Sequence, residues 1–197
     1  IEISRGCPFA CSFCSFGNLG KPYSLFPIEK IIEKIENGYL FTKQIGLVCA
    51  ALPPIGYIEN IVSNFPDANL HFSSLRVDSF DDKYIDIFST LNVQTVTLAP
   101  ETANENIRKK LGKNFSDDQI IELIKNFVKN GVYKFKLYFI IGLKLSSQNK
   151  QMTDDEQSKN LKISEEEIYF EIEELIDFID KIQSYVYSQT RILPYIS

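Results

Sequence analysis

No run of about 20 apolar residues, the length that a helix needs to cross a bilayer, occurs in this chain. A segment with the pattern of a secretory signal is also missing. These absences argue against a membrane-spanning or secreted protein and predict a cytoplasmic location, or the reducing interior of an organelle. With 197 residues, of which 44% are hydrophobic and 24% charged, the chain has an ordinary globular composition and suits one domain with a substantial core.

The chain also lacks an excess of positive charge. Lysine and arginine number 21 against 26 aspartate and glutamate residues, which gives a formal net charge of −5. Broad binding to a phosphate backbone depends on an excess of basic residues. Nucleic acid is therefore not the expected partner, although a local basic patch is compatible with this charge.

Residues that bind transition metals are scarce, and most of them lie in one place. The chain has one histidine, His71, and four cysteines. Cys7, Cys11 and Cys14 follow a short apolar strand at a CxxxCxxC spacing. Thiolate ligands select zinc, Cu(I) or iron–sulfur clusters, and cluster irons are commonly held by cysteines crowded into one loop. Three local ligands would leave one iron of a four-iron cubane without a protein thiolate.

A structural zinc site and a disulfide framework are the alternatives. Zinc needs four ligands, and the distant candidates for a fourth are Cys49 and His71. A disulfide framework needs an oxidising compartment and is typical of smaller, cysteine-rich chains. The spacing therefore favours a cluster over zinc. Cys49 is expected to act as a buried small hydrophobe, and His71 as a structural residue away from the site.

Short β-type runs alternate with amphipathic helices along the rest of the chain. Helices are expected at 27–38, 57–64, 81–91, 104–111, from 116 and from 164, and strands at 46–51, 70–77, 93–98, 133–143 and 190–193. Ser116 and Ser164 each open a helix with a capping-box pattern. Alternation of this kind predicts an α/β protein with a parallel sheet and right-handed crossovers, as an open sheet or a barrel. The almost wholly polar residues 144–162 are expected to be a disordered insertion without a packing role.

The stretch from Ser4 to Cys14 resembles the cluster motif of the radical S-adenosylmethionine (SAM) superfamily, in which an aromatic residue usually precedes the third cysteine. Phe13 matches that aromatic. The resemblance implies that Cys7, Cys11 and Cys14 bind a [4Fe-4S] cluster, and that the amino and carboxylate groups of SAM chelate the fourth iron. An electron from the cluster would cleave SAM to methionine and a 5′-deoxyadenosyl radical. A reductant protein such as ferredoxin or flavodoxin is the implied partner.

The resemblance extends along most of the chain. Segments 73–79, 97–101 and 136–143 look like parts of the radical SAM branch that is often fused to an N-terminal cobalamin-binding domain, a branch close to the methylthiotransferases. It implies a partial (β/α)6 TIM-like barrel with parallel strands, as one radical SAM core domain over residues 1–197. A start at Ile1 rather than Met fits a piece of a longer chain. Cobalamin is expected only through a flanking domain that this chain does not contain.

Candidate cofactor-binding residues follow the strands, because the βα loops of parallel folds open at the carboxyl ends of the strands. By resemblance, Phe13 and Gly142 lie near the SAM adenine, although Phe13 can instead pack beneath its loop. Glu101 matches a contact to the ribose or methionine part of SAM, or else stabilises the start of the next helix. Arg76 can pair with a carboxylate such as that of SAM, or with Asp78 or Glu101.

One feature of the family is replaced in this chain. Many members place a glycine-rich segment ending in glutamate after the second strand, where it receives the SAM amino group. Here Cys49-Ala50-Ala51-Leu52 stands at that position. Backbone carbonyl groups are therefore the acceptors that this segment can offer to the SAM amino group.

These observations lead to one main hypothesis and one alternative. The main hypothesis is a radical SAM enzyme core that binds a [4Fe-4S] cluster and cleaves SAM reductively, acting as an iron–sulfur oxidoreductase or as a methyl or methylthio transferase. The sequence identifies neither the substrate nor a catalytic residue. The alternative is a non-catalytic zinc- or cluster-binding scaffold module. About one zinc without sulfide would support the scaffold, whereas about four irons with acid-labile sulfide would support the cluster.

Overall fold

A computed structural model describes residues 1–18, 22–91, 93, 95–143, 163–186 and 189–196. The helices in these ranges are α1 (Ser15–Asn18), α2 (Ile28–Tyr39), α3 (Ile55–Asn64), α4 (Asp82–Thr90), α5 (Glu105–Lys110), α6 (Asp117–Lys129) and α8 (Glu165–Ser184), with the 3₁₀ turn η1 (Val77–Ser79). The strands are β1 (Ser4–Arg5), β2 (Ser24–Leu25), β3 (Gln44–Leu47), β4 (Asn69–Phe72), β5 (Val96–Glu101), β6 (Lys134–Phe139) and β7 (Arg191–Ile196). The expected insertion at 144–162 lies outside the described residues.

The parallel strands follow one another in chain order. β3 pairs with β4, β5 with β6, and β6 with β7, each time in parallel. Two isolated parallel bridges connect these pieces and the start of the chain: Glu2 with Val48, and Leu75 with Leu98. Within the described part of the chain, no pairing joins β7 back to the N-terminal segment, so the barrel stays open. The expected partial barrel with parallel strands is confirmed.

One pairing departs from the expected parallel arrangement. β1 and β2 form an antiparallel pair, with Ser4 opposite Leu25 and Arg5 opposite Ser24. Each of these strands is two residues long. Periodicity cannot identify elements this short, which is why neither β2 nor α1 was expected from the sequence.

Two strands, β3 and β4, end earlier than the sequence indicated. β3 stops at Leu47, after which Val48 makes a single bridge to Glu2. β4 stops at Phe72, and Leu75 then pairs with Leu98 of β5. The chain changes its hydrogen-bonding partner at each of these points. The strands predicted from composition alone were therefore too long at both places.

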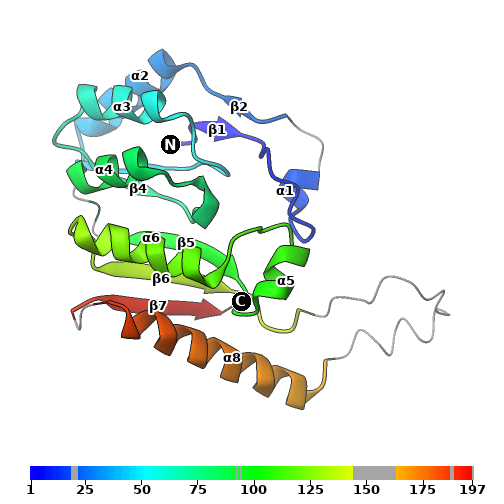
Figure 1. Cartoon of the computed structure of the whole chain (residues 1–197). Helices are drawn as coiled ribbons and strands as arrows, with labels where there is room; N and C mark the ends of the chain where they lie inside the picture. The colour runs from blue at the N-terminus through cyan, green and yellow to red at the C-terminus, as the bar shows by residue number, and fades with distance from the viewer. Residues whose placement is uncertain (19–21, 92, 94, 144–162, 187–188, 197) are drawn as a thin grey trace.

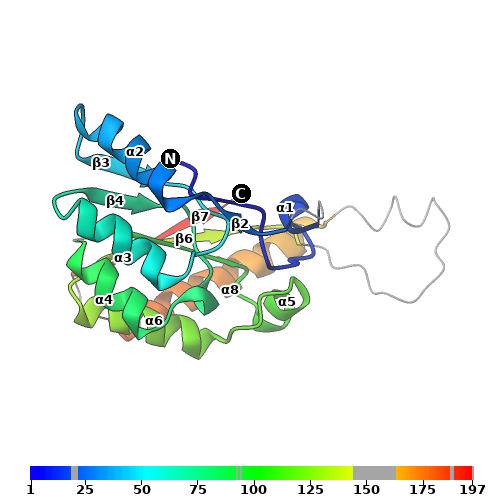
Figure 2. The same cartoon turned by 90° about the horizontal axis from the view of Figure 1, so that it is seen from above.

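The helices follow one another in Figure 1 from α2 and α3 at the top, through α4 and α6, to α8 at the bottom, and Figure 2 shows α3, α4 and α6 along the same side of β3 and β4. The strand arrows of β1, β5 and β6 point toward the end of the molecule where α1 and α5 lie (Figure 1). Both expected capping boxes are present, at Ser116 with Gln119 and at Ser164 with Glu167. None of the described helices combines the length and the apolar character that crossing a bilayer requires.

An aromatic cluster holds the middle of this helical layer against the sheet. The ring of Phe80 packs edge to face against Phe88 of α4 and Phe127 of α6, with centroids 5.5 and 5.2 Å apart. Phe127 also lies 6.2 Å from Phe135 of β6. Each such pair contributes about 1 kcal/mol beyond its buried area. Because Phe80 directly follows η1, this packing also fixes the loop that carries Arg76.

Candidate metal centre

The cysteine loop follows β1 at the end of the molecule where the strands terminate. Gly6, at φ +76°, turns the chain out of β1 into the loop, a backbone conformation that glycine adopts without strain. Within the loop the amide of Cys14 donates to the carbonyl of Cys11 over 3.1 Å. None of the four cysteines, all of which the structure describes, forms a disulfide: Cys11 and Cys49 are buried, and Cys7 and Cys14 are half-buried.

Two glycines allow other parts of the chain to pack directly on the cysteine loop. A Cβ at Gly17 of α1 would overlap the carbonyl group of Phe9. Gly112 has φ +84°, and a Cβ there would lie 3.3 Å from the carbonyl oxygen of Ala10 and 3.4 Å from Cα of Cys11. The amide of Ser12 also donates to the carbonyl of Leu111 over 3.1 Å. The loop is therefore held against the segment that follows α5.

Arg76 connects the third parallel segment to the cysteine loop. Its Nη1 donates to Cys11 Sγ over 2.9 Å, and its Nε and Nη2 donate to the two carboxylate oxygens of Asp78 over 2.9 and 2.7 Å. Nη2 also donates to the carbonyl of Gly112 over 3.2 Å, and the guanidinium carbon lies 4.1 Å from the ring centroid of Phe9. Asp78 was one of the expected partners of Arg76. A SAM carboxylate at this guanidinium stays a prediction.

The electrostatic surroundings keep Arg76 charged although its side chain is only 8% exposed. Burial lowers the pKa of the guanidinium, but the hydrogen bonds and charge of Asp78, with a smaller contribution from Cys11, outweigh burial. The pKa of Arg76 therefore lies above its ordinary value. A full positive charge thus lies in contact with the sulfur of Cys11.

Glu101 ends β5 in an unusual backbone conformation. It is the one described non-glycine residue with positive φ, at +70°, and the β5–β6 register shifts between Leu98 and Glu101. Its carboxylate accepts a hydrogen bond from Lys113 Nζ over 2.6 Å. The start of α5 is capped by Asn104 instead, whose side chain accepts from the amides of Asn106 and Ile107. The carboxylate of Glu101 is therefore paired with a lysine and does not serve as that cap.

Lys113 is the residue that sequence reasoning missed. Its ammonium group also donates to the carbonyl of Ala99 over 2.5 Å, and it lies 5.9 Å from the ring centroid of Phe13. Phe13 is 42% exposed, so it does not pack beneath its loop. Lys113 thus connects the cysteine loop to the end of β5. The signal in the sequence was weak, because a lysine in a loop is usually solvated.

Gly142, the last candidate from the sequence, lies beside the start of α8. Its φ is +85°, its amide donates to a carboxylate oxygen of Glu171 over 2.6 Å, and a Cβ there would lie 3.0 Å from Cδ1 of Ile163. These contacts explain why glycine is needed at this position. They involve α8 and the residues before it, so proximity of Gly142 to an adenine stays a prediction.

The segment that replaces the family's glycine-rich sequence lies next to Cys7. The carbonyl of Ala50 is 4.0 Å from Cys7 Sγ. The neighbouring carbonyls have other partners, since Ser73 Oγ donates to that of Cys49 over 2.9 Å and Tyr84 donates to that of Pro53. Burial raises the pKa of the Cys49 thiol to about 11, so the thiol stays neutral. A neutral buried thiol agrees with the expected role of Cys49 as a small hydrophobe.

Two cavities flank this region. One of about 430 Å³ lies beside the cysteine loop, and its lining includes Pro8, Phe9, Tyr23, Pro53 and Tyr84. This volume is within the range of small-molecule sites.

The sole histidine, His71, lies away from the cysteine loop, on the exposed side of β4. Its Nε2 lies 2.5 Å from the side-chain oxygen of Gln44.

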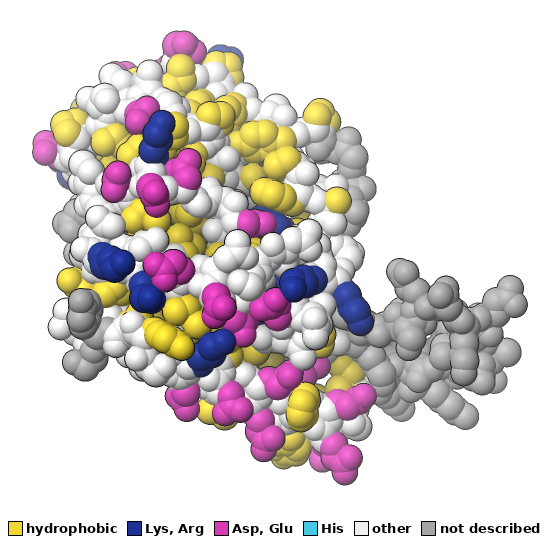
Figure 3. All heavy atoms as spheres, viewed as in Figure 1, with side chains coloured by type: hydrophobic (Ala, Val, Ile, Leu, Met, Phe, Trp, Pro, Cys, Tyr) yellow, Lys and Arg dark blue, Asp and Glu magenta, His cyan; other side chains and the backbone are white. Residues whose placement is uncertain are grey.

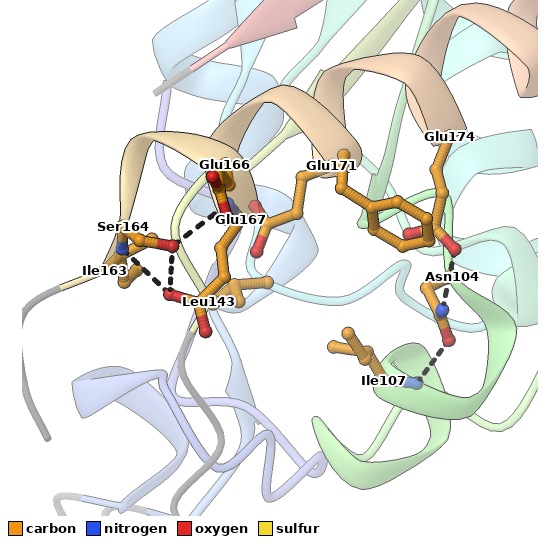
Figure 4. Close-up of a pocket in the computed structure, with 10 residues that line it drawn as sticks. Asn104, Ile107, Leu143, Ile163, Ser164, Glu166, Glu167, Glu171 and Glu174 are labelled. Atoms are coloured by element: carbon orange, nitrogen blue, oxygen red, sulfur yellow. Dashed lines mark hydrogen bonds between the residues drawn. The ribbon is translucent and has the colours of Figure 1, made fainter.

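The other cavity, of about 350 Å³, lies between α5 and the start of α8. Figure 4 shows its acidic wall, with Glu166, Glu167, Glu171 and Glu174 on α8, and the hydrogen bond of 3.0 Å from Asn104 to Glu174 across it. Figure 3 shows acidic side chains gathered along the lower edge of the molecule, where Figure 1 places α8. This wall belongs to an acidic helix surface, and the residues that are described as lining the cavity include no cysteine.

The cysteine set can be tested against the two metals that the sequence left open. In the part of the chain that the structure describes, no three His, Cys, Asp or Glu side chains converge closely enough to hold one metal ion. Zinc would need four ligands around a single ion. A cubane takes each thiolate on a different iron, so its cysteines stand apart from one another. The loop offers three cysteines that form no disulfide, with a buried cation against the middle one, and this donor set fits the cluster.

Comparisons with known proteins agree with this geometry. A sequence model of the Radical SAM superfamily matches residues 1–151. An uncharacterized protein of Methanocaldococcus jannaschii is 31% identical over 147 residues, which cover 73% of this chain and 32% of that protein. An uncharacterized methyltransferase of Pyrococcus horikoshii is 27% identical over 152 residues, covering 72% of this chain and 32% of its own length. The chain therefore spans about a third of the length of these curated relatives.

A solved structure gives the same result for the fold. The radical SAM methyltransferase TsrM from Kitasatospora setae, with cobalamin and a [4Fe-4S] cluster bound, superimposes with a TM-score of 0.62. The match has 13% sequence identity and covers 73% of this chain and 31% of that protein. At this identity the similarity supports the partial barrel alone. Together with the family match over residues 1–151, the fold and the cysteine loop lead to one conclusion: the chain belongs to the radical SAM superfamily.

Proposed function

We propose that this chain is the core of a radical SAM enzyme in which Cys7, Cys11 and Cys14 hold a [4Fe-4S] cluster and SAM is cleaved reductively. The observation that carries the proposal is the position of the cysteine loop. It lies where the parallel strands end, and its middle cysteine is buried against a charged guanidinium. In this superfamily the cluster, once reduced, supplies the electron that converts SAM to methionine and a 5′-deoxyadenosyl radical.

The residues around the loop supply binding and orientation for this chemistry. The exposed ring of Phe13 offers a flat apolar surface to the adenine of SAM. Glu101, whose side chain is 13% exposed, accepts hydrogen bonds from the ribose or methionine part while Lys113 holds its carboxylate. The carbonyl of Ala50, next to Cys7, accepts a hydrogen bond from the SAM amino group in place of the missing glutamate. Gly142 completes the set of candidate SAM contacts, whereas Arg76 contacts the loop cysteine Cys11.

We further propose that the reaction of the whole protein is a methyl or methylthio transfer. The names of two similar proteins, a methyltransferase of Pyrococcus horikoshii and the methyltransferase TsrM, favour this subclass over simple oxidoreduction. Because the chain spans about a third of its curated relatives, cobalamin and much of the substrate site would come from other parts of the protein. Ferredoxin or flavodoxin in a reducing cytoplasm or organelle interior would supply the electron.

The test is anaerobic reconstitution with iron and sulfide, followed by iron and sulfide analysis, reduction with dithionite, addition of SAM, and chromatography. The parent chain should bind about four irons with sulfide and release 5′-deoxyadenosine, whereas a Cys14→Ala variant should do neither. The same chromatogram also measures S-adenosylhomocysteine, the product that remains when SAM donates its methyl group.

The matched control is Cys49→Ala, because Cys49 is a buried cysteine outside the loop. This variant should load and cleave like the parent if the loop cysteines alone hold the cluster. About one zinc without sulfide in the parent would favour the scaffold module instead. A well-formed four-iron cluster that yields no 5′-deoxyadenosine would contradict SAM cleavage by this chain.

A further inference from the structure

The guanidinium of Arg76 is held so that one edge faces the sulfur of Cys11. A guanidinium is planar, so its two parallel bonds to Asp78 fix the direction of the remaining Nη1 edge. That edge donates to Cys11 Sγ over 2.9 Å. The carbonyl of Gly112 and the ring of Phe9 hold the same plane from other sides. The N–H···S hydrogen bond is therefore built into the fold, in contrast to the contacts of a flexible surface arginine.

The backbone of Arg76 is fixed as firmly as its side chain. The preceding residue, Leu75, donates to the carbonyl of Thr97 over 2.9 Å and accepts from the amide of Ala99 over 3.1 Å. The following turn is held by Phe80 against Phe88 and Phe127. Both ends of the Arg76 segment thus belong to the core, and the distance from the guanidinium to the cysteine loop is set by the sheet.

This contact has a consequence for a cluster bound at Cys11. Hydrogen bonds to the sulfur ligands, local charge and solvent exposure set the reduction potential of an iron–sulfur cluster. A cationic donor withdraws electron density from a coordinated thiolate, so it stabilises the reduced cluster, which carries one more negative charge. Cys11 is only 7% exposed, so water competes little with the guanidinium for its sulfur.

We propose that Arg76 is a positioning residue whose Nη1 is held against Cys11 Sγ, where it raises the reduction potential of a cluster bound at that cysteine. This inference depends on the proposed function only for the presence of the cluster, and it is independent of SAM cleavage. Asp78 already occupies the edge of the Arg76 guanidinium that can form two parallel hydrogen bonds. That edge is therefore not available for a bidentate pair with a SAM carboxylate.

The experiment is a redox titration of the reconstituted chain without SAM, in which EPR follows the reduced cluster against mediators of known potential. Arg76→Met keeps the length and the apolar stem of the side chain but removes the donor and the charge. We expect this variant to bind iron and sulfide and to titrate at a more negative midpoint potential than the parent. Arg76→Lys keeps the charge but cannot donate to Asp78 and Cys11 in the same planar geometry, so its midpoint should lie between the two.

Arg5→Met is the matched control. Arg5 lies two residues before Cys7 and also makes a bidentate pair. Its Nε and Nη2 donate to the two carboxylate oxygens of Glu2 over 3.0 and 2.6 Å. Its removal should leave the midpoint potential unchanged. A parent-like midpoint in Arg76→Met would overturn the proposal. If Arg76→Met takes up no cluster, the midpoint of Arg76→Lys decides, and a parent-like value there, or loss of the cluster in both variants, also overturns it. Failure of the parent itself to bind a cluster would instead count against the proposed function.

Discussion

The ammonium group of Lys113 lies 2.6 Å from a carboxylate oxygen of Glu101, with the lysine side chain 4% and the glutamate side chain 13% exposed. Glu101 has φ +70°, a conformation that costs a non-glycine residue about 1 kcal/mol or more. The ion pair therefore holds a strained residue in place where β5 ends. Strain of this kind is typical of positions that contact a ligand, which agrees with the cofactor contact proposed for Glu101.

Removal of the lysine should leave a largely buried carboxylate without its partner. We expect Lys113→Met to lower the free energy of unfolding by about 3 kcal/mol, because an unpaired buried charge is strongly destabilising. The control is Lys109→Met, which breaks a solvent-exposed pair with Glu105. The side chain of Lys109 is 52% exposed and that of Glu105 is 33% exposed. That change should cost far less, because a solvent-exposed ion pair contributes little to stability. Urea denaturation of the metal-free chain measures both, and equal losses would refute the importance of the Lys113–Glu101 pair.

Gly112 and Gly131 allow strain and contact with the cysteine loop to be separated. Both have positive φ, +84° and +88°, but a Cβ at Gly112 would press on Ala10 and Cys11, whereas a Cβ at Gly131 would meet nothing within 4 Å. An alanine at either position should lower stability by about 1 kcal/mol through its backbone conformation. Only Gly112→Ala should also reduce the iron bound per chain after reconstitution, because it displaces the loop. Equal iron contents in the two variants would show that this packing does not matter for the cluster.

Local signals were sufficient for much of the fold. The capping patterns at Ser116 and Ser164 predicted the start of two helices, and both capping boxes are present. The alternation of strands and helices predicted a parallel sheet. It could not predict where the chain changes partners, as Leu75 does when it pairs with Leu98. That event depends on the spacing between distant strands, which leaves no mark on local hydrophobic periodicity.

The candidate site divides in the same way. The cysteines were visible because three soft ligands within eight residues are rare and their spacing is specific. Lys113 was not visible, since its burial depends on a contact with Glu101 twelve residues away and on a ring of the cysteine loop. For Arg76 the sequence supplied the partner Asp78 but not the contact with Cys11, which lies 65 residues away along the chain.

Cys49 should make the stability of the chain fall at high pH. Burial raises the pKa of its thiol from the ordinary value of 9.0 to about 11, so the unfolded chain loses this proton from about pH 9 upward while the folded chain keeps it until about pH 11. The unfolded state then binds fewer protons than the folded state, and the free energy of unfolding falls as the pH rises through this window. The contribution of Cys49 is fully present below pH 9, and about 2 kcal/mol of it should be lost by pH 11.

The measurement is urea unfolding of the reduced, metal-free chain and of Cys49→Ala at pH 8 and 11. The variant should be less stable at pH 8, because it leaves a small cavity, but should lose less stability on going to pH 11. Burial also raises the pKa of Tyr84, to about 12. Burial is the largest cause of that shift and is shared by both proteins, so most of the Tyr84 contribution cancels in the difference, whereas the smaller part that comes from the charge of Cys49 belongs to the effect being measured. Equal losses in the parent and in Cys49→Ala would mean that the thiol is already ionised or solvated in the folded chain. It would then be a nucleophile rather than the inert packing residue that its surroundings indicate.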